Sequence, residues 1–233
     1  MQDYLEQFFK GISSWKGSLF KVEHVEEPYA KEYLGKLVKA GLVERVSWGW
    51  YWIPGKAGTF WDFLRGDRNF KAIAGQTAAS FWNNDFIHRD VYVVKVKDSS
   101  YGKALVAFAK ARGWAVVVEL VKEDDTYVKS DGVYVEAIED CVIGCMQRWA
   151  FADAFAVLYE NRKKSLYPCL AEKSYWKRIS KSDVRVRQAL SYGLGRLNVL
   201  ARQDIFPVGR TSLGDSFVVK EIDEAVEKVV DLG

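Results

Sequence analysis

Hydrophobic side chains recur at helical spacing between Pro28 and Gly41, and the N-terminal part of the chain is organised around this stretch. Pro28 follows two carboxylates, which suits a first helical turn, and Gly41 stands where a helix places a C-terminal glycine. At about 100° per residue the apolar positions share one face; they are Ala30, Tyr33, Leu34, Leu37 and Val38. We therefore predict a helix with one buried stripe.

The opposite face of this helix is polar and mostly basic. It carries Lys31, Glu32, Gly35, Lys36 and Lys39. Lysines on one face can neutralise DNA phosphates and release counterions. A mid-helix glycine costs roughly 1 kcal/mol against alanine, so Gly35 is either tolerated or allows close approach of a DNA backbone. A solvated lysine face that binds nothing stays open as the alternative.

Two β-rich runs, LVERV and WYWIP, follow the helix and are separated by Ser47-Trp48-Gly49. This pattern predicts two strands joined by a tight turn. A helix leading into a hairpin, after one or two earlier helices, is the outline of a winged helix-turn-helix. In that outline the helix reads DNA, the hairpin is the wing, and Arg45 and Trp48 are further candidate DNA contacts. Because side chains alternate, we expect one face of WYWIP to pack on the helices and the other to be available.

The segments before the central helix are less distinct. Residues 2–10 have the pattern of a short amphipathic helix. The stretch SLFKVEHV alternates like a strand, but a helix-turn-helix requires a short second helix at this place, so we expect a helix here. We expect His24 to be a surface or capping residue.

Beyond Pro54 the pattern mixes strands with helices, which predicts an α+β protein with a winged helix-turn-helix at residues 1–56 and a larger mixed α/β domain at 57–233. Asp131-Gly132 between two β-rich runs is a strong hairpin signal. The other expected elements are a short helix at Phe60–Leu64, strands at FKAIAG, DVYVVKVK and WAVVVELV, helices at TAASFWNN, YGKALVAFAKARG, ADAFAVLYENRKK and VRQALSYGLGRLNVL, a buried helix from Ile138 to Trp149, a short FVV strand and a terminal helix at KEIDEAVEKVV.

Composition places the chain among ordinary globular proteins. Of its 233 residues 49% are hydrophobic and 28% are charged. No apolar run approaches the roughly 20 residues that span a bilayer, and the N-terminus lacks a signal pattern, so we expect a cytoplasmic protein without membrane contact. Three cysteines without CxxC spacing argue against a zinc site, and we expect Cys141 and Cys145 to be buried and reduced.

Charge is distributed unevenly along the chain. Residues 1–55 hold seven basic and seven acidic side chains, whereas residues 161–210 have a net charge of +9. Within this basic segment, residues 162–210, aromatic side chains interleave with cations as on nucleic-acid-binding surfaces. We expect its cations to assist DNA binding or to attract an acidic partner such as a toxin surface, with a solvated connection as the alternative; they include Lys177, Arg178, Lys181, Arg185 and Arg187.

Four stretches together resemble the AbiEi-type antitoxins, the regulators of type IV toxin–antitoxin systems. These are LGKLVKAGLVERVSWGWYWIP, AIAGQTAASFWNNDFIHRDVYVV, YVEAIEDCVIGCMQ and LSYGLGRLNVL, whose order fits the family over most of the chain. The sequence departs from the family in having Trp48-Gly49 where arginine-glycine is frequent in the wing turn, and in placing Asp140 rather than arginine after Glu139.

The resemblance implies a winged-helix regulator that represses its own promoter, and a second domain that helps to oppose a toxin. The partners expected on this basis are double-stranded DNA of its own promoter and a nucleotidyltransferase-like toxin. The sequence leaves the oligomeric state open, with a dimer on DNA as one alternative. Whether the toxin is contacted directly stays open. No cofactor is expected.

Motifs of catalysis are not evident in the sequence. There is no phosphate-cradling GxxxxGK[ST], no GxGxxG and no GxSxG. We therefore predict a DNA-binding protein without enzymatic activity. Two alternatives stay open: a protein-interaction module that uses its tryptophans, and a metal-dependent nuclease that uses Asp124, Asp125, Asp131 or Glu136.

Overall fold

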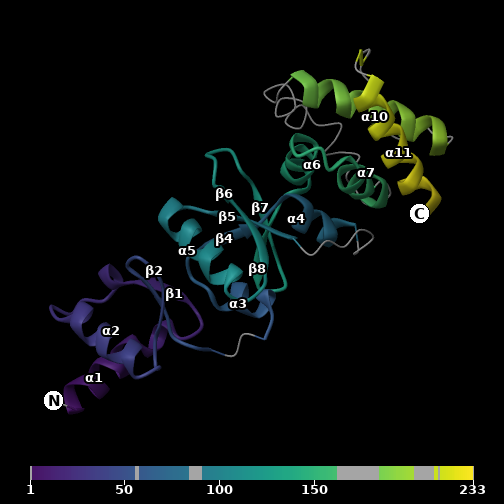
Figure 1. The fold of residues 1–233 in the computed structure, drawn as a ribbon. Helices are drawn as coiled ribbons and strands as arrows, with labels where there is room; N and C mark the ends of the chain where they lie inside the picture. Colours follow the sequence, from purple (N-terminus) through teal and green to yellow (C-terminus); the bar gives the residue numbers. More distant parts are fainter. Residues whose placement is uncertain are drawn as a thin grey trace. The chain divides into compact units, whose positions relative to one another are not determined.

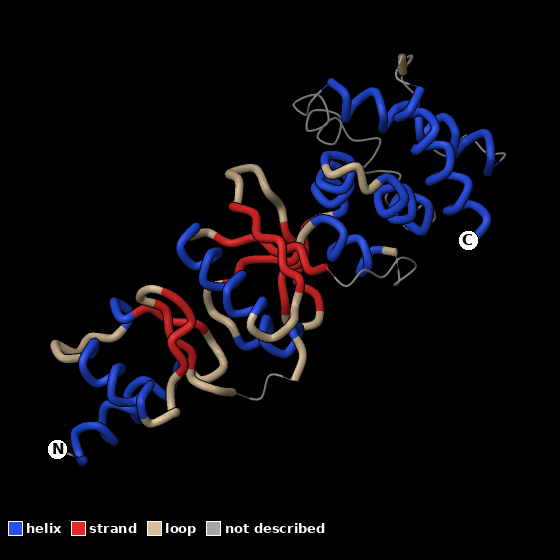
Figure 2. The backbone as a smooth tube through the Cα atoms, viewed as in Figure 1, coloured by secondary structure: helices blue, strands red, loops and turns tan. Residues whose placement is uncertain are grey.

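The computed structural model describes residues 2–55, 58–83, 91–161, 184–201, 213–214 and 216–232 (Figure 1). Its architecture mixes helices with strands, as the sequence predicts (Figure 2). The chain divides into two compact units. Unit 1 comprises residues 1–72, 90–123 and 129–134, and unit 2 comprises residues 73–89, 124–128 and 135–233.

Unit 1 begins with helices and short strands that alternate along the chain. The elements are α1 (Gln2–Ile12), the 3₁₀ turn η1 (Ser13–Trp15), β1 (Leu19–Lys21), the 3₁₀ turn η2 (Val22–His24), α2 (Ala30–Lys39), β2 (Glu44–Ser47) and β3 (Trp50–Trp52). β3 pairs antiparallel with both β1 and β2, so the strand order is β1-β3-β2. The first core of the unit lies between this sheet and the helices α1 and α2, and it includes Phe8, Phe20, Leu34, Leu37, Tyr51 and Ile53.

The predicted central helix is confirmed as α2. Ala30, Leu34 and Leu37 are buried, and Gly41 follows the helix with a φ of 72°, the left-handed conformation that glycine adopts at a helix end. The helix expected at SLFKVEHV is wrong: this stretch forms β1 and η2. Its alternating residues pair with β3, where Leu19 and Phe20 become fully buried, and this pairing outweighs helix formation. His24 caps η2, since its Nδ1 accepts the backbone N–H of Lys21 at 3.3 Å.

The β2–β3 hairpin is confirmed, but both faces of β3 are covered. Tyr51 belongs to the core beside α1 and α2. On the other face, Trp50 packs on Tyr101 at 5.5 Å between ring centroids, and Trp52 packs on Phe108 at 5.1 Å. The expectation of an available strand face is therefore wrong, because a helix distant in sequence packs against it.

That helix is α5 (Ser99–Lys110), which lies between β5 (Val91–Val96) and β6 (Ala115–Leu120) in the sequence. It begins at Asp98, whose side chain accepts the backbone N–H of Ser100, and ends before Gly113, whose φ is 75°. The helix comes very close to β6, since a Cβ on Gly102 would lie 2.8 Å from the side chain of Val118.

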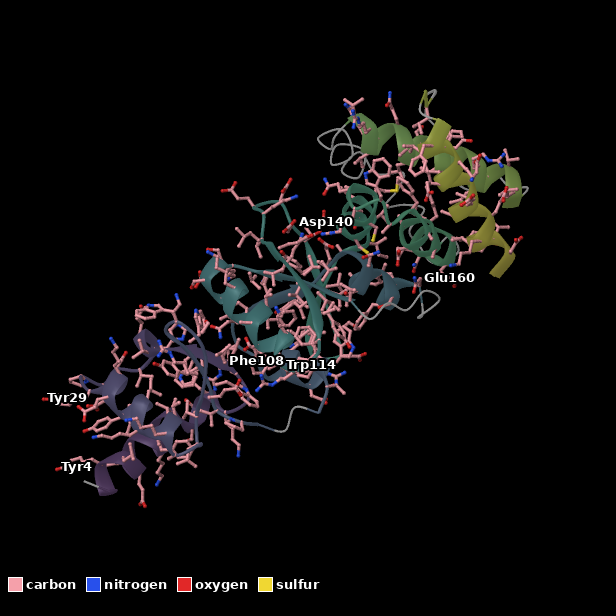
Figure 3. The ribbon with its side chains drawn as sticks, viewed as in Figure 1. Tyr4, Tyr29, Phe108, Trp114, Asp140 and Glu160 are labelled. Atoms are coloured by element: carbon pink, nitrogen blue, oxygen red, sulfur yellow. The ribbon has the colours of Figure 1, made fainter. Side chains whose placement is uncertain are left out.

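Arg112, just after α5, links this helix to β2. Its guanidinium group makes two hydrogen bonds to the Glu44 carboxylate, at 2.6 and 3.3 Å. It also lies over the rings of Trp52 and Phe108. Phe108 and Trp114 lie together, with ring centroids 6.1 Å apart (Figure 3). The sequence after β3 is therefore part of the packing of the N-terminal hairpin.

The remaining strands form a five-stranded sheet with the order β6-β5-β4-β8-β7. The expected short helix is α3 (Phe60–Gly66), and the other strands are β4 (Phe70–Ile73), β7 (Tyr127–Ser130) and β8 (Val133–Glu136). β5 pairs with β6 in parallel, and β4 pairs with β8 in parallel. The expected hairpin turn is confirmed at Asp131-Gly132, where both residues have positive φ, as a two-residue turn of this kind requires. β4, β7 and β8 each have residues in both units.

Unit 2 is built mainly of helices. They are α4 (Gly75–Trp82), α6 (Ile138–Gln147), α7 (Phe151–Glu160), α10 (Val184–Ala201) and α11 (Ser216–Leu232). α7 packs on α4, α6 and α11, and α10 packs on α6 and α11. Gly193 makes room for the ring of Phe155, because a Cβ there would lie 2.0 Å from it.

Two of the predictions for unit 2 are wrong. The expected FVV strand is the first turn of α11, because it continues the apolar stripe that buries Ile222, Val226 and Val229. Trp149 is not part of the buried helix: it follows α6 with a φ of 61° and is 54% exposed. Cys141 and Cys145 are buried free thiols, as expected.

Candidate nucleic-acid interface and basic cavity

The outward face of α2 holds the cations that the sequence singled out. Lys31 and Lys39 are exposed, and Gly35 is exposed with nothing within 4 Å of the place where a Cβ would lie. Lys36 instead makes an ion pair with Glu32 at 2.6 Å and lies over the ring of Tyr33. The face therefore has two cations directed to solvent and a third that is paired within the helix.

The tip of the β2–β3 hairpin is a second part of the same candidate surface. Trp48 is 85% exposed, the highest exposure among the large hydrophobic side chains that the structure describes. The guanidinium carbon of Arg45 lies 5.5 Å from the centre of the Trp48 ring, which is a cation–π distance. Gly49 completes the turn with a φ of 74°. The hairpin thus presents an aromatic plane and a cation to solvent.

A buried carboxylate, Asp67, holds together three segments of unit 1. Oδ1 of Asp67 accepts the backbone N–H groups of Asn69 and Phe70, at 2.7 and 3.1 Å, and the hydroxyl of Tyr101 at 3.0 Å. Oδ2 accepts the backbone N–H of Leu19 at 2.9 Å, and the Ser18 hydroxyl lies 3.3 Å away. Burial raises the pKa of Asp67, and the hydrogen bonds oppose this shift. Asp67 thereby fixes the start of β4 against β1 and α5.

A basic cavity of about 400 Å³ lies beside this carboxylate. The residues that line it are His24, Trp50, Arg68, Asn69, Phe70, Lys71, Lys97, Asp98, Tyr101 and Tyr134. They come from η2, β3, the start of β4, the end of β5, α5 and β8, all within unit 1. The lining has three cations and a single carboxylate, so its charge favours an anion.

The single carboxylate of the cavity is already bonded. Asp98 accepts the Lys21 ammonium at 3.1 Å, the backbone N–H of Ser100 at 2.8 Å and the Ser100 hydroxyl at 2.9 Å. The backbone hydrogen bond from Ser100, with these other contacts, lowers the pKa of Asp98. Two cations of the lining lie near aromatic rings: the Lys71 ammonium is 4.9 Å from the Tyr134 ring centre and the Arg68 guanidinium is 5.2 Å from that of Trp15.

Of the five cations predicted in the basic segment, Lys177, Arg178 and Lys181 lie outside the described residues. Arg185 and Arg187 are on the first turn of α10, where Arg185 is exposed and Arg187 is half-buried. The described part of the segment therefore offers one clearly solvent-facing cation from this set.

Three of the four acidic residues considered for a nuclease site have a structural place elsewhere. Asp131 forms the β7–β8 turn, and Asp125 accepts the Tyr127 hydroxyl at 3.1 Å. Glu136 is buried and its Oε2 accepts the backbone N–H of Gly75 at 2.7 Å. Among the residues that the structure describes, no group of three or more His, Cys, Asp or Glu side chains is arranged to hold a metal ion.

Glu136 belongs to a buried charged region of unit 2. A Cβ on Gly75 or on Gly144 would lie 2.6 or 2.9 Å from Nη1 of Arg148, so both glycines make room for this guanidinium group. Burial lowers the pKa of Arg148 and raises that of the Cys141 thiol. This packing is that of a structural core.

Sequence reasoning found the α2 face and the hairpin tip but missed the basic cavity. Its lining residues are distant in the sequence and lie on six elements, so no local motif connects them. The one available signal was the spacing of Arg68, Lys71 and Lys97 at the ends of two expected strands.

The comparisons with known proteins give no relative: no family model, no curated protein and no solved structure matches the chain. Of the helices that the structure describes, none is both long and apolar enough to cross a membrane.

Proposed function

We propose that the chain is a DNA-binding regulator whose N-terminal part acts as a modified winged helix-turn-helix. In this proposal α2 reads double-stranded DNA and the β2–β3 hairpin is the wing. The element order α1, β1, η2, α2, β2, β3 and the strand order β1-β3-β2 support it. The three-residue turn η2 stands at the position of the second helix of the motif, so the reader would be held mainly by the buried stripe of α2.

The observation that carries the proposal is the exposed tip of the hairpin. A tryptophan that is 85% exposed lowers solubility, and the two tryptophans of β3, Trp50 and Trp52, are buried. An aromatic plane with Arg45 over it can lie against a sugar–phosphate backbone or a base edge. Lys31 and Lys39 on α2 supply phosphate contacts, and Gly35 leaves room for a close backbone approach.

The regulatory role is the second part of the proposal. The resemblance to AbiEi-type antitoxins supports an autorepressor that binds the promoter of its own operon beside a nucleotidyltransferase-like toxin gene. Lys36 is paired with Glu32 in the free protein, so on DNA it would exchange a carboxylate for a phosphate. We expect it to contribute less than Lys31 and Lys39.

The experiment measures affinity for duplex DNA from upstream of the gene as a function of salt, by fluorescence anisotropy with the full chain. The full chain is required because a fragment of residues 1–56 would uncover Trp50 and Trp52. Replacing Lys31, Lys39 and Arg45 together by alanine removes three proposed phosphate contacts. The slope of log affinity against log salt should shrink by about 1 per contact, thus by about 3 in total.

The matched control removes three exposed lysines elsewhere in unit 1, by the triple change Lys10→Ala, Lys103→Ala and Lys110→Ala. It alters the net charge equally, so it separates local contacts from the general field of the protein. Equal slopes in the two triple variants would refute the assignment of α2 and the hairpin as the reader. A parallel incubation with magnesium tests the nuclease alternative. A metal-dependent nuclease would cut the DNA, whereas a regulator would bind it and leave it intact.

A further inference from the structure

We propose that the basic cavity of unit 1 binds the phosphate of a single nucleotide, with the base lying against the exposed ring of Tyr134. The proposal rests on the cavity alone and is independent of the proposed DNA reader. Its volume of about 400 Å³ falls within the range of small-molecule sites and is suited to one nucleotide rather than to a chain.

The charge of the cavity selects an anion. Arg68, Lys71 and Lys97 line it, and its carboxylate, Asp98, is bonded to Lys21 and Ser100. Lys97 is exposed at the end of β5, where a flexible ammonium group can meet a phosphate oxygen. Arginine and lysine together provide directional and point-charge contacts to a phosphate, and such charge-assisted hydrogen bonds are the strong ones.

The aromatic side chains select a planar group in addition to the anion. Tyr134 is 45% exposed although it belongs to a sheet, and Lys71 occupies a position over its ring. Trp50 is buried and contributes an apolar wall of the cavity. Stacking of a base on an aromatic ring is favourable for every base, so this pocket would tolerate both purines and pyrimidines.

The site is also rigidly held, which favours binding. Asp67 bonds Asn69, Phe70 and Tyr101, three residues that line the cavity. The side-chain amide of Asn69 donates to the carbonyl oxygen of Leu19 at 2.6 Å. Because the segments are ordered before a ligand arrives, less conformational entropy is lost on binding.

A ligand in this cavity would contact the strand that carries the hairpin. Trp50 opposes Ser47 in the β2–β3 ladder, and Ser47 is adjacent to Trp48 at the tip. One wall of the cavity and the tip of the hairpin therefore belong to the same pair of strands.

Isothermal titration calorimetry of the full chain tests the site with three probes: adenosine 5′-monophosphate, guanosine 5′-monophosphate and inorganic phosphate. We expect one saturable site for each nucleotide and weaker binding of phosphate. Lys97→Ala should lower the affinity for the nucleotides and for phosphate alike, by about tenfold or more. Tyr134→Ala should lower the affinity for the nucleotides by about tenfold and leave the affinity for phosphate unchanged. Tyr134→Phe should bind all three probes like the original protein.

The control is Lys103→Ala, which removes an exposed cation of α5 that does not line the cavity. The proposal is refuted if no probe saturates at concentrations up to about 10 mM, or if Lys97→Ala and Lys103→Ala bind equally well. It is also refuted if Lys97→Ala weakens duplex DNA while no mononucleotide binds, because the phosphate in the cavity would then belong to a nucleic-acid chain. Nucleotide binding that persists in the Lys31, Lys39 and Arg45 triple variant would separate this site from the DNA reader.

Discussion

Replacing Asp67 by asparagine should destabilise unit 1 by about 2–4 kcal/mol, although the change is nearly isosteric. Both carboxylate oxygens act only as acceptors, from three backbone N–H groups and the Tyr101 hydroxyl, with the Ser18 hydroxyl nearby. An asparagine amide turns one acceptor into a donor. Whichever oxygen is replaced, at least one buried N–H of the protein then faces another N–H.

The size of this loss of stability follows from the orientation of the asparagine amide that costs least. The amide nitrogen would take the place of Oδ2, because the Ser18 hydroxyl can rotate and accept from it, and only the Leu19 N–H loses its partner. One unsatisfied buried donor costs about 1–3 kcal/mol, and the bonds that remain are weaker without the negative charge. Relief from burying a charge offsets part of this loss, because burial raises the pKa of Asp67.

Urea unfolding at several pH values, followed by tryptophan fluorescence, measures this loss. A raised carboxyl pKa means that the folded state binds more protons than the unfolded state from pH 3.8 upward, so this group's contribution to stability falls as pH rises through that window. Asparagine has no such dependence. The difference in the free energy of unfolding between the original protein and Asp67→Asn should therefore narrow as pH rises from 3.8 toward the pKa of Asp67 in the folded protein.

The control for this experiment is Asp231→Asn, an exposed carboxylate on α11 that should change the free energy of unfolding by less than about 0.5 kcal/mol. A loss of less than about 1 kcal/mol for Asp67→Asn, or a gap that widens with rising pH, would refute the reasoning. Either result would mean that the segments around Asp67 relax to find other partners.

Three further predictions concern the helices and the hairpin. Gly35→Ala should stabilise the protein by roughly 1 kcal/mol, since α2 has open space there. Gly193→Ala should destabilise it by about 1–3 kcal/mol, because the added methyl group would press on the buried ring of Phe155. Thermal unfolding should therefore show a higher melting temperature for the first variant and a lower one for the second. Trp48→Ala should leave stability within about 0.5 kcal/mol and weaken duplex DNA in anisotropy, and unchanged affinity would exclude the tip from the interface. Arg112→Lys should cost about 1 kcal/mol in urea unfolding, because lysine can replace neither the paired hydrogen bonds to Glu44 nor the ring contacts, and equal midpoints would contradict this.

Local patterns predicted those elements whose signals lie within one segment. The stripe of α2, the glycine that ends it and the Asp131-Gly132 turn all depend on neighbouring residues, and the structure confirms them. The strands β5 and β6 and the helix α5 were equally clear from their periodicity. The two candidate DNA surfaces, on α2 and at Trp48, were also found because each is a local exposure pattern.

The errors arose where a distant partner decides the outcome. The segment with Leu19 and Phe20 alternates like a strand, and it was the helix-turn-helix outline that favoured a helix there; pairing with β3 decides for the strand. Trp50 and Trp52 look like an open wing face until α5 packs on them. The basic cavity requires six elements to be placed together, which is a property of the tertiary structure.

The covering of β3 on both faces limits how this protein can be divided or recombined. The strand packs on α1 and α2 on one side and on α5 on the other. A fragment of residues 1–55 fused to another protein would therefore expose the indole rings of Trp50 and Trp52. A chimera that keeps α5 together with the first 55 residues should remain monodisperse, whereas one cut just after the hairpin should self-associate through those rings. The hairpin can therefore be moved to another protein only together with α5, a helix that begins more than forty residues downstream.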